Sequence, residues 1–412
     1  MGASATPIDI PRARRLDSVD LLRGTIMIIM ALDHVRDFMS DRIHLDPVDL
    51  KVTTPGIFFT RWITHFCAPT FIFLAGTGAF LAGSRGKSKP ALAWFLFTRG
   101  LWFALYEITI NRAAWWGHWS LWENGAGVFW AIGWAMVALS LLVFLPLPLI
   151  GIIGGVLVVG HNALDGLTAG QVGMPPWLWM ILHDPPPPES PLGYPIIIPG
   201  IGKVLFGTGY CLIPWTGTMA LGYCFGTILL HEAKQRRKEL FMLGGVVTLA
   251  FLVLRAVNIY GDPSQWSDQP TVDFTVCSFL NCTKYPASLL YLLMTLGPAI
   301  LFLGAFDQVN GDAPFARQII VFGRVPFFFY FLHIPLIHGT AVVIEYIRFH
   351  KSLLAAHGPW EITKDNIFPE YGLSLPYVYL VWAIVIVVLY LPCRWYADVK
   401  ARRRDLWWLS YL

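Results

Sequence analysis

The residues most able to do chemistry are concentrated in one apolar segment near the N-terminus of this sequence. Arg23 and His34 stand eleven positions apart in it. Eleven residues are about three helical turns, so in a helix both side chains point the same way, about 16 Å apart along the axis. Asp20 and Asp37 fall within about 60° of that face, whereas Asp33 points elsewhere. Because charged groups are costly inside a membrane, this polar stripe predicts a functional site that follows the helix from end to end.

These residue types suit the transfer of an acyl group. Such a reaction needs a base beside the attacking oxygen or nitrogen and a hydrogen-bond donor for the oxyanion that develops. His34 is the candidate base, and Asp37 or Asp33 is the carboxylate expected to orient it. Arg23 could bind an anionic group at the other end of the helix. The alternative interpretation is that Arg23 and Asp20 only reach one membrane surface while His34 marks the other.

Two further apolar segments carry candidate oxyanion donors. His65 lies about two turns into the second segment, near the expected depth of His34, so the two histidines could share a cavity. A His65 that is merely hydrogen-bonded to a neighbouring carbonyl is the alternative. Arg255 and Asn258 lie one turn apart in the seventh segment. Arg255 is too deep to reach the membrane surface easily, so it is expected to pair with a buried anion or carboxylate.

Polar residues also accompany two later segments. Lys284 and Tyr285 immediately precede the eighth segment, and Arg324 and His333 belong to the ninth. Prolines in the ninth segment expose backbone carbonyls, which is tolerated only against protein or a wet cavity. His333 and His338 are about 140° apart on an ideal helix, so at most one of them is expected to face a given site.

The composition indicates which elements must position these groups. Of the 412 residues, 56% are hydrophobic and 14% are charged, against roughly 25% charged in soluble domains. An ordinary soluble globule, a disordered chain and a disulfide-stapled mini-protein are excluded. The net charge of +4 is too small to indicate a nucleic-acid partner. Trp115 and three tryptophans near it are expected to anchor the chain at the lipid headgroups, and a platform for a ligand is the alternative.

Ten apolar runs predict an all-α, polytopic bundle of ten or eleven transmembrane helices in a lipid bilayer. The runs are residues 19–39, 57–82, 91–111, 127–145, 147–160, 207–230, 240–260, 286–306, 318–345 and 376–396. Basic clusters near residues 12–15, 85–89, 234–238, 317–324 and 400–404 fall on one side in this count. Both termini are therefore predicted to be cytoplasmic, with segments 1–18 and 397–412 flanking a transmembrane domain at 19–396.

The cysteines do not indicate a metal centre. No Cys/His spacing resembles a zinc site, so no metal is predicted. Cys277 and Cys282 lie in a loop on the outer side, where an oxidising compartment would permit a bridge, although spacing alone leaves its geometry open. The other four cysteines lie in apolar runs and are expected to be buried thiols.

Five segments together carry a resemblance to a known family. They are Ser-Val-Asp-Leu-Leu-Arg-Gly at 18–24 with a downstream Asp-His, Cys-Ala-Pro-Thr-Phe-Ile-Phe-Leu-Ala-Gly at 67–76, Arg-x-x-Asn-x-Tyr-Gly-Asp-Pro at 255–263, Thr-Lys-Tyr-Pro-x-Ser at 283–288 and Gly-Arg-Val-Pro-Phe-Phe-Phe-Tyr-x-Leu-His at 323–333. This set resembles bacterial membrane proteins related to heparan-α-glucosaminide N-acetyltransferase over most of residues 16–396. Arg23 and His34 also match the Arg-x10-His pattern of a wider superfamily of membrane acyltransferases, from which alone a role for Arg23 carries over.

The resemblance implies that an acetyl group moves from cytoplasmic acetyl-coenzyme A to an amine or hydroxyl of a sugar, or of another polar acceptor, on the opposite side. The bacterial cytoplasmic membrane is the implied location, and a homodimer is left open. The expected acetyl-coenzyme A ligands are Arg23, Asp20, Arg324, Lys284, Tyr285 and His333. Direct transfer and an acetyl-histidine intermediate both remain open.

Two rival classes of protein remain. A transporter or flippase of a polar solute would use the same buried charges to line a pathway. The sequence has no evident internal repeat, which counts against that class because such transporters usually show one. A membrane scaffold or sensor does not account for charges buried in at least three segments.

Overall fold

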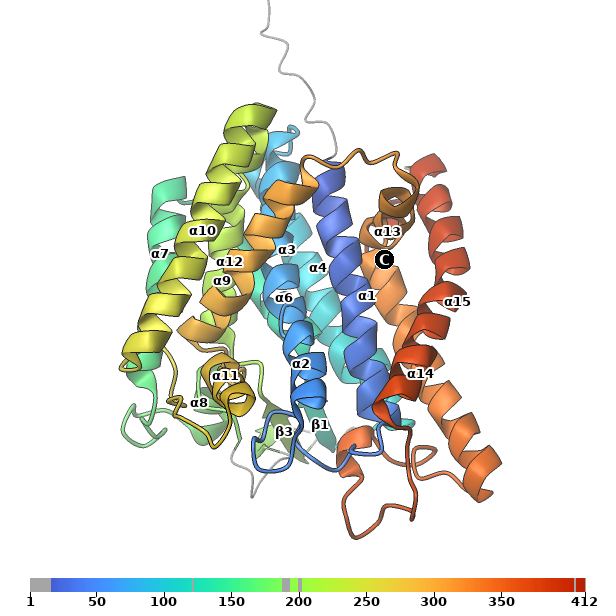
Figure 1. Ribbon diagram of the computed structural model, residues 1–412. Helices are drawn as coiled ribbons and strands as arrows, with labels where there is room; N and C mark the ends of the chain where they lie inside the picture. Colours follow the sequence, from blue (N-terminus) through green and yellow to red (C-terminus); the bar gives the residue numbers. More distant parts are fainter. Residues whose placement is uncertain (1–15, 121, 187–192, 199–201, 404, 412) are drawn as a thin grey trace, which may run out of the picture.

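The protein is a bundle of long helices with a small sheet and several loops gathered at one end (Figure 1). The computed structural model describes residues 16–120, 122–186, 193–198, 202–403 and 405–411. The α-helices are α1 (Asp17–Met39), α2 (Pro55–Thr64), α3 (Cys67–Ser84), α4 (Lys89–Tyr106), α5 (Arg112–Trp116), α6 (Val128–Leu142), α7 (Leu147–Gly160), α8 (Pro176–Leu182), α9 (Leu212–Phe225), α10 (Ala233–Val257), α11 (Val272–Leu280), α12 (Leu289–Phe306), α13 (Pro314–Arg324), α14 (Pro326–Phe349) and α15 (Leu375–Arg402).

Within the described residues, seven helical stretches are long and apolar enough to cross a membrane. They are Pro55–Ser84, Leu147–Leu164, Leu212–Leu230, Ala233–Val257, Leu289–Phe306, Pro326–Phe349 and Leu375–Arg402, and Val128–Leu142 is apolar but shorter. The chain is therefore a mostly helical membrane protein. The count of ten spans, the cytoplasmic position of both termini and the division into three segments stay predictions.

Helix α1 lies among the other helices, and most of its side chains are buried. It packs against α2, α3, α12, α13, α14 and α15. Its backbone comes so close to α13 that a Cβ atom on Gly24 would stand 2.1 Å from the Ile319 carbonyl oxygen, and one on Gly323 would stand 1.8 Å from that of Asp20. Glycine at both positions allows this approach. The enclosed position of α1 explains how one helix can carry six charged residues.

Two of the predicted runs are interrupted. The run at 57–82 is divided into α2 and α3, with His65 and Phe66 between them. The run at 318–345 is divided at Val325, because the residue before a proline is disfavoured in the helical conformation, and Pro326 follows. Both breaks lie beside polar residues that the sequence had singled out.

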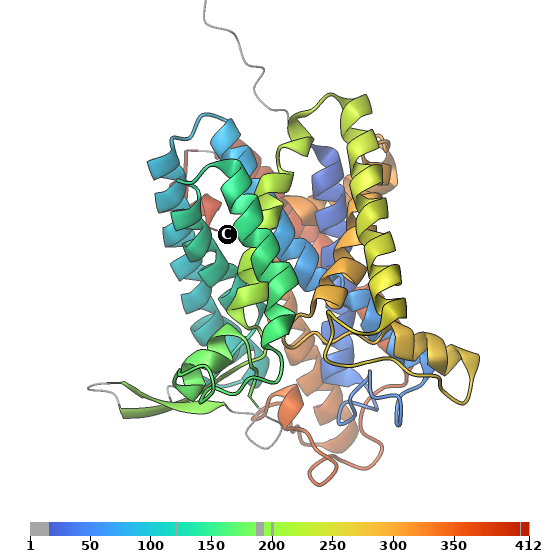
Figure 2. The same ribbon diagram turned by 90° about the vertical axis from the view of Figure 1, so that its left-hand side faces the viewer.

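A three-stranded sheet corrects the all-α expectation. Its strands are β1 (Glu123–Ala126), β2 (Tyr194–Ile198) and β3 (Gly202–Thr208), in the order β1-β3-β2. β3 pairs parallel with β1 and antiparallel with β2. The sheet lies at the end of the bundle where α1 finishes (Figure 2). It joins two loops that are distant in the sequence into one surface.

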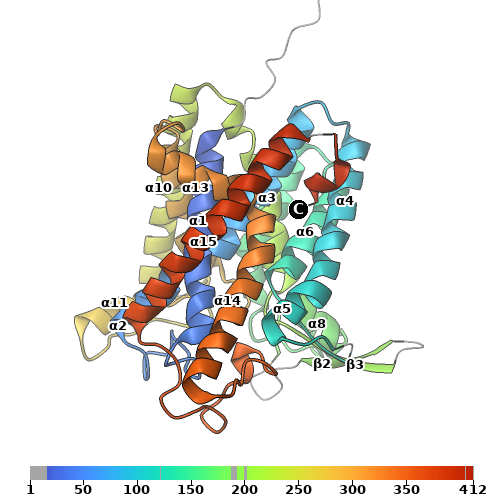
Figure 3. The ribbon, with the colours of Figure 1, turned by 90° about the vertical axis from the view of Figure 1, so that its right-hand side faces the viewer.

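The described parts of the predicted basic clusters gather at the opposite end of the bundle. Helices α1, α4 and α10 begin there and α15 ends there (Figures 1 and 3). The stretches 85–89, 234–238, 317–324 and 400–403 are thus on one side, as the positive-inside pattern requires. Residues 12–15 and 404 of the predicted clusters lie outside the described residues.

Candidate active site

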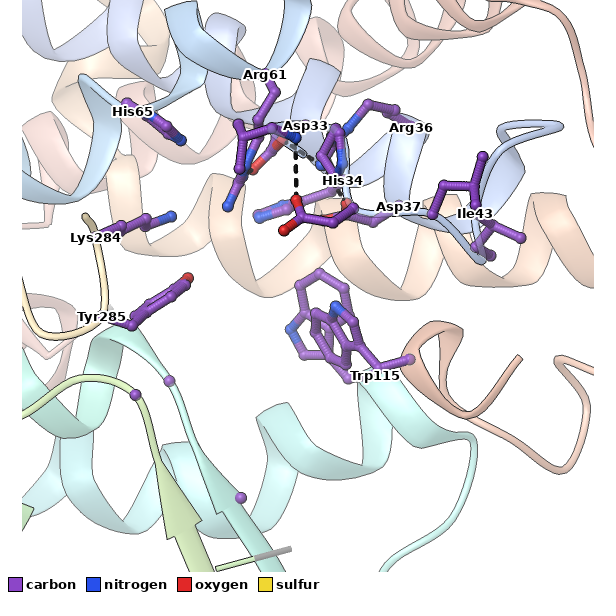
Figure 4. Close-up of a pocket in the computed structure, with 18 of the residues that line it drawn as sticks. Asp33, His34, Arg36, Asp37, Ile43, Arg61, His65, Trp115, Lys284 and Tyr285 are labelled. Carbon is purple, nitrogen blue, oxygen red and sulfur yellow. Dashed lines mark hydrogen bonds and ion pairs between the residues drawn. The ribbon is translucent and has the colours of Figure 1, made fainter. Parts of the chain in front are cut away.

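A cavity of about 1160 Å³ lies at the end of the bundle where α1 finishes (Figure 4). Its walls come from the last turns of α1, from α2, from the sheet and from the turn at residues 281–285. Exposed side chains, among them Asp46 and Lys364, stand at its rim. The cavity therefore opens to the surface at this end.

His34 faces this cavity and is hydrogen-bonded to a second histidine on α14. Its Nδ1 lies 2.6 Å from Nε2 of His333. Nδ1 of His333 lies 2.7 Å from the carbonyl oxygen of Tyr330. His333 is completely buried and does not line the cavity, so of the two histidines only His34 can contact a ligand there.

This chain of bonds fixes the proton positions on the two neutral rings. A carbonyl oxygen can only accept, so Nδ1–H of His333 donates to Tyr330 and its Nε2 has the lone pair. Nδ1–H of His34 must then donate to that Nε2, which leaves the lone pair of His34 on its own Nε2. A carboxylate was expected in the orienting position. The structure instead places there an imidazole that is anchored by a carbonyl.

Asp33 and Asp37 belong to an ion-pair cluster beside His34. Arg36 donates to Asp33 at 2.9 Å and to Asp37 at 2.5 Å. Arg61 of α2 donates to the other carboxylate oxygen of Asp33. Two carboxylates thus balance two guanidinium groups, as buried charges require. Asp33 lines the same cavity as His34, although the helical wheel gave it a different direction.

Lys284 and Tyr285 reach into the cavity from the side opposite Ile43 (Figure 4). Lys284 Nζ lies 5.1 Å from the centre of the Tyr285 ring. His65 also lines the cavity, and its Nδ1 has no hydrogen-bond partner within the described part of the chain. Because the ion-pair cluster is balanced, Lys284 adds positive charge to this side of the cavity.

Trp115 is part of the cavity wall rather than a membrane anchor. Its side chain is buried, its ring centre lies 4.9 Å from that of His34, and it stacks on Phe38 and Trp360. The spacing of tryptophans near a helix end matched the pattern of a headgroup belt. The contacts with Phe38 and Trp360 come from distant segments, which that pattern does not reveal.

Arg255 and Asn258 do not line the cavity. The guanidinium of Arg255 is buried and donates to the carbonyl oxygens of Ser264, Ser278, Phe279 and Asn281 at 2.8–3.1 Å. The expectation of an anionic partner was wrong, because carbonyl oxygens at the end of α11 and in the loop before it surround the guanidinium instead. Asn258 ends α10 in the left-handed conformation and bonds to Trp266. Both residues hold the loop that leads to the 281–285 wall.

Arg23, Asp20 and Arg324 lie at the far end of α1, away from the cavity lining. Arg23 donates to Asp20 and to the carbonyl of Gly323, both at 3.4 Å. Arg324 approaches Asp20 at 4.0 Å. Buried apolar residues, among them Met27, fill α1 between the two ends. The predicted continuous stripe is thus two separate polar clusters.

His338 and the two loop cysteines are placed as well. His338 bonds to the carbonyl oxygens of Ala114 and Leu354, both at 2.7 Å, so His333 is the histidine of this helix that meets His34. Cys277 and Cys282 are free, buried thiols. The bridge that their loop position would permit is not formed.

Fold and site define a helical membrane protein with a pair of hydrogen-bonded histidines at the wall of an open cavity. The family model described as heparan-alpha-glucosaminide N-acetyltransferase, catalytic, matches residues 15–211, slightly less than half of the chain. The chain is therefore related to that acetyltransferase family, as its motifs indicated. No curated protein matches the chain.

The match divides the cavity. His34, Arg61 and His65 lie in the matched part together with the whole sheet, whereas Lys284 and His333 lie beyond residue 211. The relation to an acetyltransferase catalytic domain gives no support to the transporter alternative.

Proposed function

We propose that this protein is a membrane acyltransferase that moves an acetyl group from acetyl-coenzyme A to an amine or hydroxyl of a sugar or a similar polar acceptor. One observation carries the proposal. A histidine whose free lone pair faces a large open cavity stands in a chain related to an acetyltransferase catalytic domain. The name of that family points to an amino sugar as the first acceptor to test.

His34 is the proposed general base. Its Nε2 takes the proton of the acceptor's amine or hydroxyl while the acceptor attacks the thioester carbonyl, and the proton then passes to the departing coenzyme A thiolate as the C–S bond breaks. His333 accepts the hydrogen bond from His34 Nδ1–H and so keeps the reactive nitrogen aimed at the cavity. An acetyl group carried on Nε2 is the alternative course, and both begin at the same nitrogen.

The developing oxyanion needs a donor, and His65 and Lys284 are the proposed groups. Both line the cavity. The positively charged ammonium of Lys284 would stabilise an oxyanion more strongly in a partly desolvated site than in water. Arg255 and Asn258 are not proposed as oxyanion donors, because they already donate hydrogen bonds to backbone carbonyl oxygens, that of Trp266 among them.

The donor is proposed to enter at the end where α1 begins. Arg23 and Arg324 would bind its phosphates there, as guanidinium groups commonly do. The thioester must then travel about 16 Å along α1 to reach His34. The apolar packing around Met27 and Met30 has to part for that passage. Donor binding should therefore loosen the contact between α1 and its neighbours.

The decisive experiment measures binding and turnover separately in the purified full-length protein. Calorimetry should detect acetyl-coenzyme A, and addition of glucosamine should release the coenzyme A thiol. His34→Ala is expected to lower that release about 10²- to 10⁴-fold, the usual contribution of a general base, with donor affinity largely unchanged. Arg23→Ala should instead weaken donor binding and leave turnover of bound donor intact.

Two outcomes would overturn the proposal. The first is the absence of acetyl-coenzyme A binding in protein that unfolds cooperatively. The second is full thiol release by His34→Ala. Mass spectrometry of protein incubated with donor alone distinguishes the two courses, since only the covalent one leaves an acetyl group on His34.

A further inference from the structure

Two histidines and an aspartate meet on the cavity side of the bundle, outside the candidate active site. His161 follows α7 in a short 3-10 helix, Asp165 comes one turn later, and His183 ends α8. One ligand atom from each residue lies within 4.8 Å of those of the other two. None of the three lines the large cavity.

The two imidazoles are buried with nitrogen atoms left over. His161 and His183 are each 2% exposed. In the described part of the chain, neither ring nitrogen of His161 makes a hydrogen bond of normal geometry, and neither does Nδ1 of His183. Buried polar atoms are nearly always satisfied, and one carbonyl near His161 can serve only one of its two nitrogens, so the others call for a partner.

Asp165 is held in place from behind, as metal-binding carboxylates usually are. One of its oxygens accepts from Asn162 at 2.8 Å and the other lies 3.1 Å from Nε2 of His183. Asn162 in turn accepts from the backbone N–H of Leu289 at the start of α12. The Ala287 carbonyl faces the His161 ring and can take the proton of its non-ligating nitrogen.

We propose that His161, Asp165 and His183 bind a divalent transition metal, with zinc as the best fit. Two imidazoles and one carboxylate suit zinc, whereas magnesium and calcium prefer oxygen ligands throughout. Tetrahedral zinc with bonds of about 2.0–2.1 Å sets its ligands about 3.3 Å apart. The three side chains must therefore close by up to about 1.5 Å from their present spacing, which small torsional changes provide. Water completes the fourth position.

The metal would act as a staple for the loop between Asp165 and His183. It joins the end of α7 to the end of α8, and α8 packs against β2 and β3. Strand β3 is part of the wall of the large cavity. The sequence predicted no metal because an aspartate and two histidines at spacings of 4 and 18 match no familiar zinc motif.

The test titrates chelator-treated, full-length protein with Zn²⁺ alone, and with Co²⁺ as an optical probe. Wild-type protein should bind one equivalent, give the intense visible absorption of low-coordinate cobalt and unfold at a higher temperature with zinc than with chelator. His183→Ala should weaken zinc binding about 100-fold or more, beyond the effect of losing an outer-shell partner. Asp165→Asn removes the charge but keeps the size of the side chain, so it should weaken zinc binding as well without disturbing the packing around Asn162.

The matched control is His357→Ala. His357 also stands near a carboxylate, at 3.6 Å from Glu361, but that pair is not buried and is not joined by a third ligand in the described chain. This variant should bind zinc like wild type. Zinc binding of wild-type affinity in Asp165→Asn, or a wild-type protein without saturable binding, would overturn the proposal. Should His183→Ala fail to fold, the comparison of wild type with Asp165→Asn still decides.

Discussion

At the residue scale, the hydrogen bond between His34 and His333 leads to a prediction that affects kcat and not KM. In His333→Phe the proton on His34 is no longer held on Nδ1, so the reactive tautomer and ring position are lost. We expect kcat to fall about 10²-fold or more, with the KM for acetyl-coenzyme A unchanged. His333→Gln should recover part of the rate, because its amide oxygen can accept the same hydrogen bond.

The control for that prediction lies on the same helix. His338 is buried like His333 but bonds only to two backbone carbonyls. His338→Phe should lower the unfolding temperature and leave kcat close to that of wild type. Equal losses of kcat in His333→Phe and His338→Phe would show that α14 packing, and not proton placement, sets the rate.

The ion-pair cluster makes a prediction about stability. Asp33→Leu leaves the partly buried Arg61 without its carboxylate, and we expect a loss of stability at or below about 3–5 kcal/mol, the range that is typical of broken buried pairs. Removing both charges in Asp33→Leu/Arg61→Met should restore much of that loss. Thermal unfolding of Asp33→Leu, Arg61→Met and the double variant measures the coupling energy between the two residues. Strictly additive effects would contradict this prediction.

How far the sequence predicts this site depends on the range of the contacts. The proximity of residues within one segment, such as Asp33 and Arg36, follows from helical periodicity, although the helical wheel directed Asp33 away from the cavity. The partner of His34 does not, because it lies 299 positions away and periodicity does not say which helices are neighbours. The same limit applies to Arg255, whose partners are carbonyl oxygens that carry no sequence signal.

At the scale of elements, Arg255 is the group that fixes the loop between α10 and α12. Arg255→Leu frees four carbonyl oxygens, and we expect faster proteolysis between residues 258 and 284 and a raised KM, since this loop leads to Lys284. Arg255→Lys should rescue only partly, because an ammonium lacks the planar fork that reaches several acceptors at once. An unchanged cleavage pattern in Arg255→Leu would refute this role.

The helices were predictable and the sheet was not. Long apolar runs indicate membrane helices because every backbone group must be satisfied within the segment. Strand β1 is Glu-Asn-Gly-Ala, which has neither the alternation nor the β-branched residues of a typical strand. It forms only because β3, about eighty positions later, pairs with it. That information lies in the tertiary structure.

At the scale of the whole molecule, the membrane orientation is a prediction that fusions can test. A reporter at Gln235, in the basic start of α10, should be cytoplasmic, and one at Gln269, in the loop before α11, should be on the other side. Gln235 lies at the start of α10 and Gln269 lies in the loop that follows this helix, so the two positions serve as each other's control. Reporters on the same side would exclude this topology.

The sheet also gives the cavity a stretch of wall that is made mainly of backbone. Four glycines, at 125, 127, 207 and 209, line the cavity where β1 and β3 pass it, so a ligand meets main chain there and few side chains. At Gly125 a methyl group would meet no atom closer than 3.9 Å, and its nearest neighbours belong to the cavity lining. Substitutions of increasing size at Gly125 would therefore narrow the cavity in steps and show how wide a substrate the protein can bind.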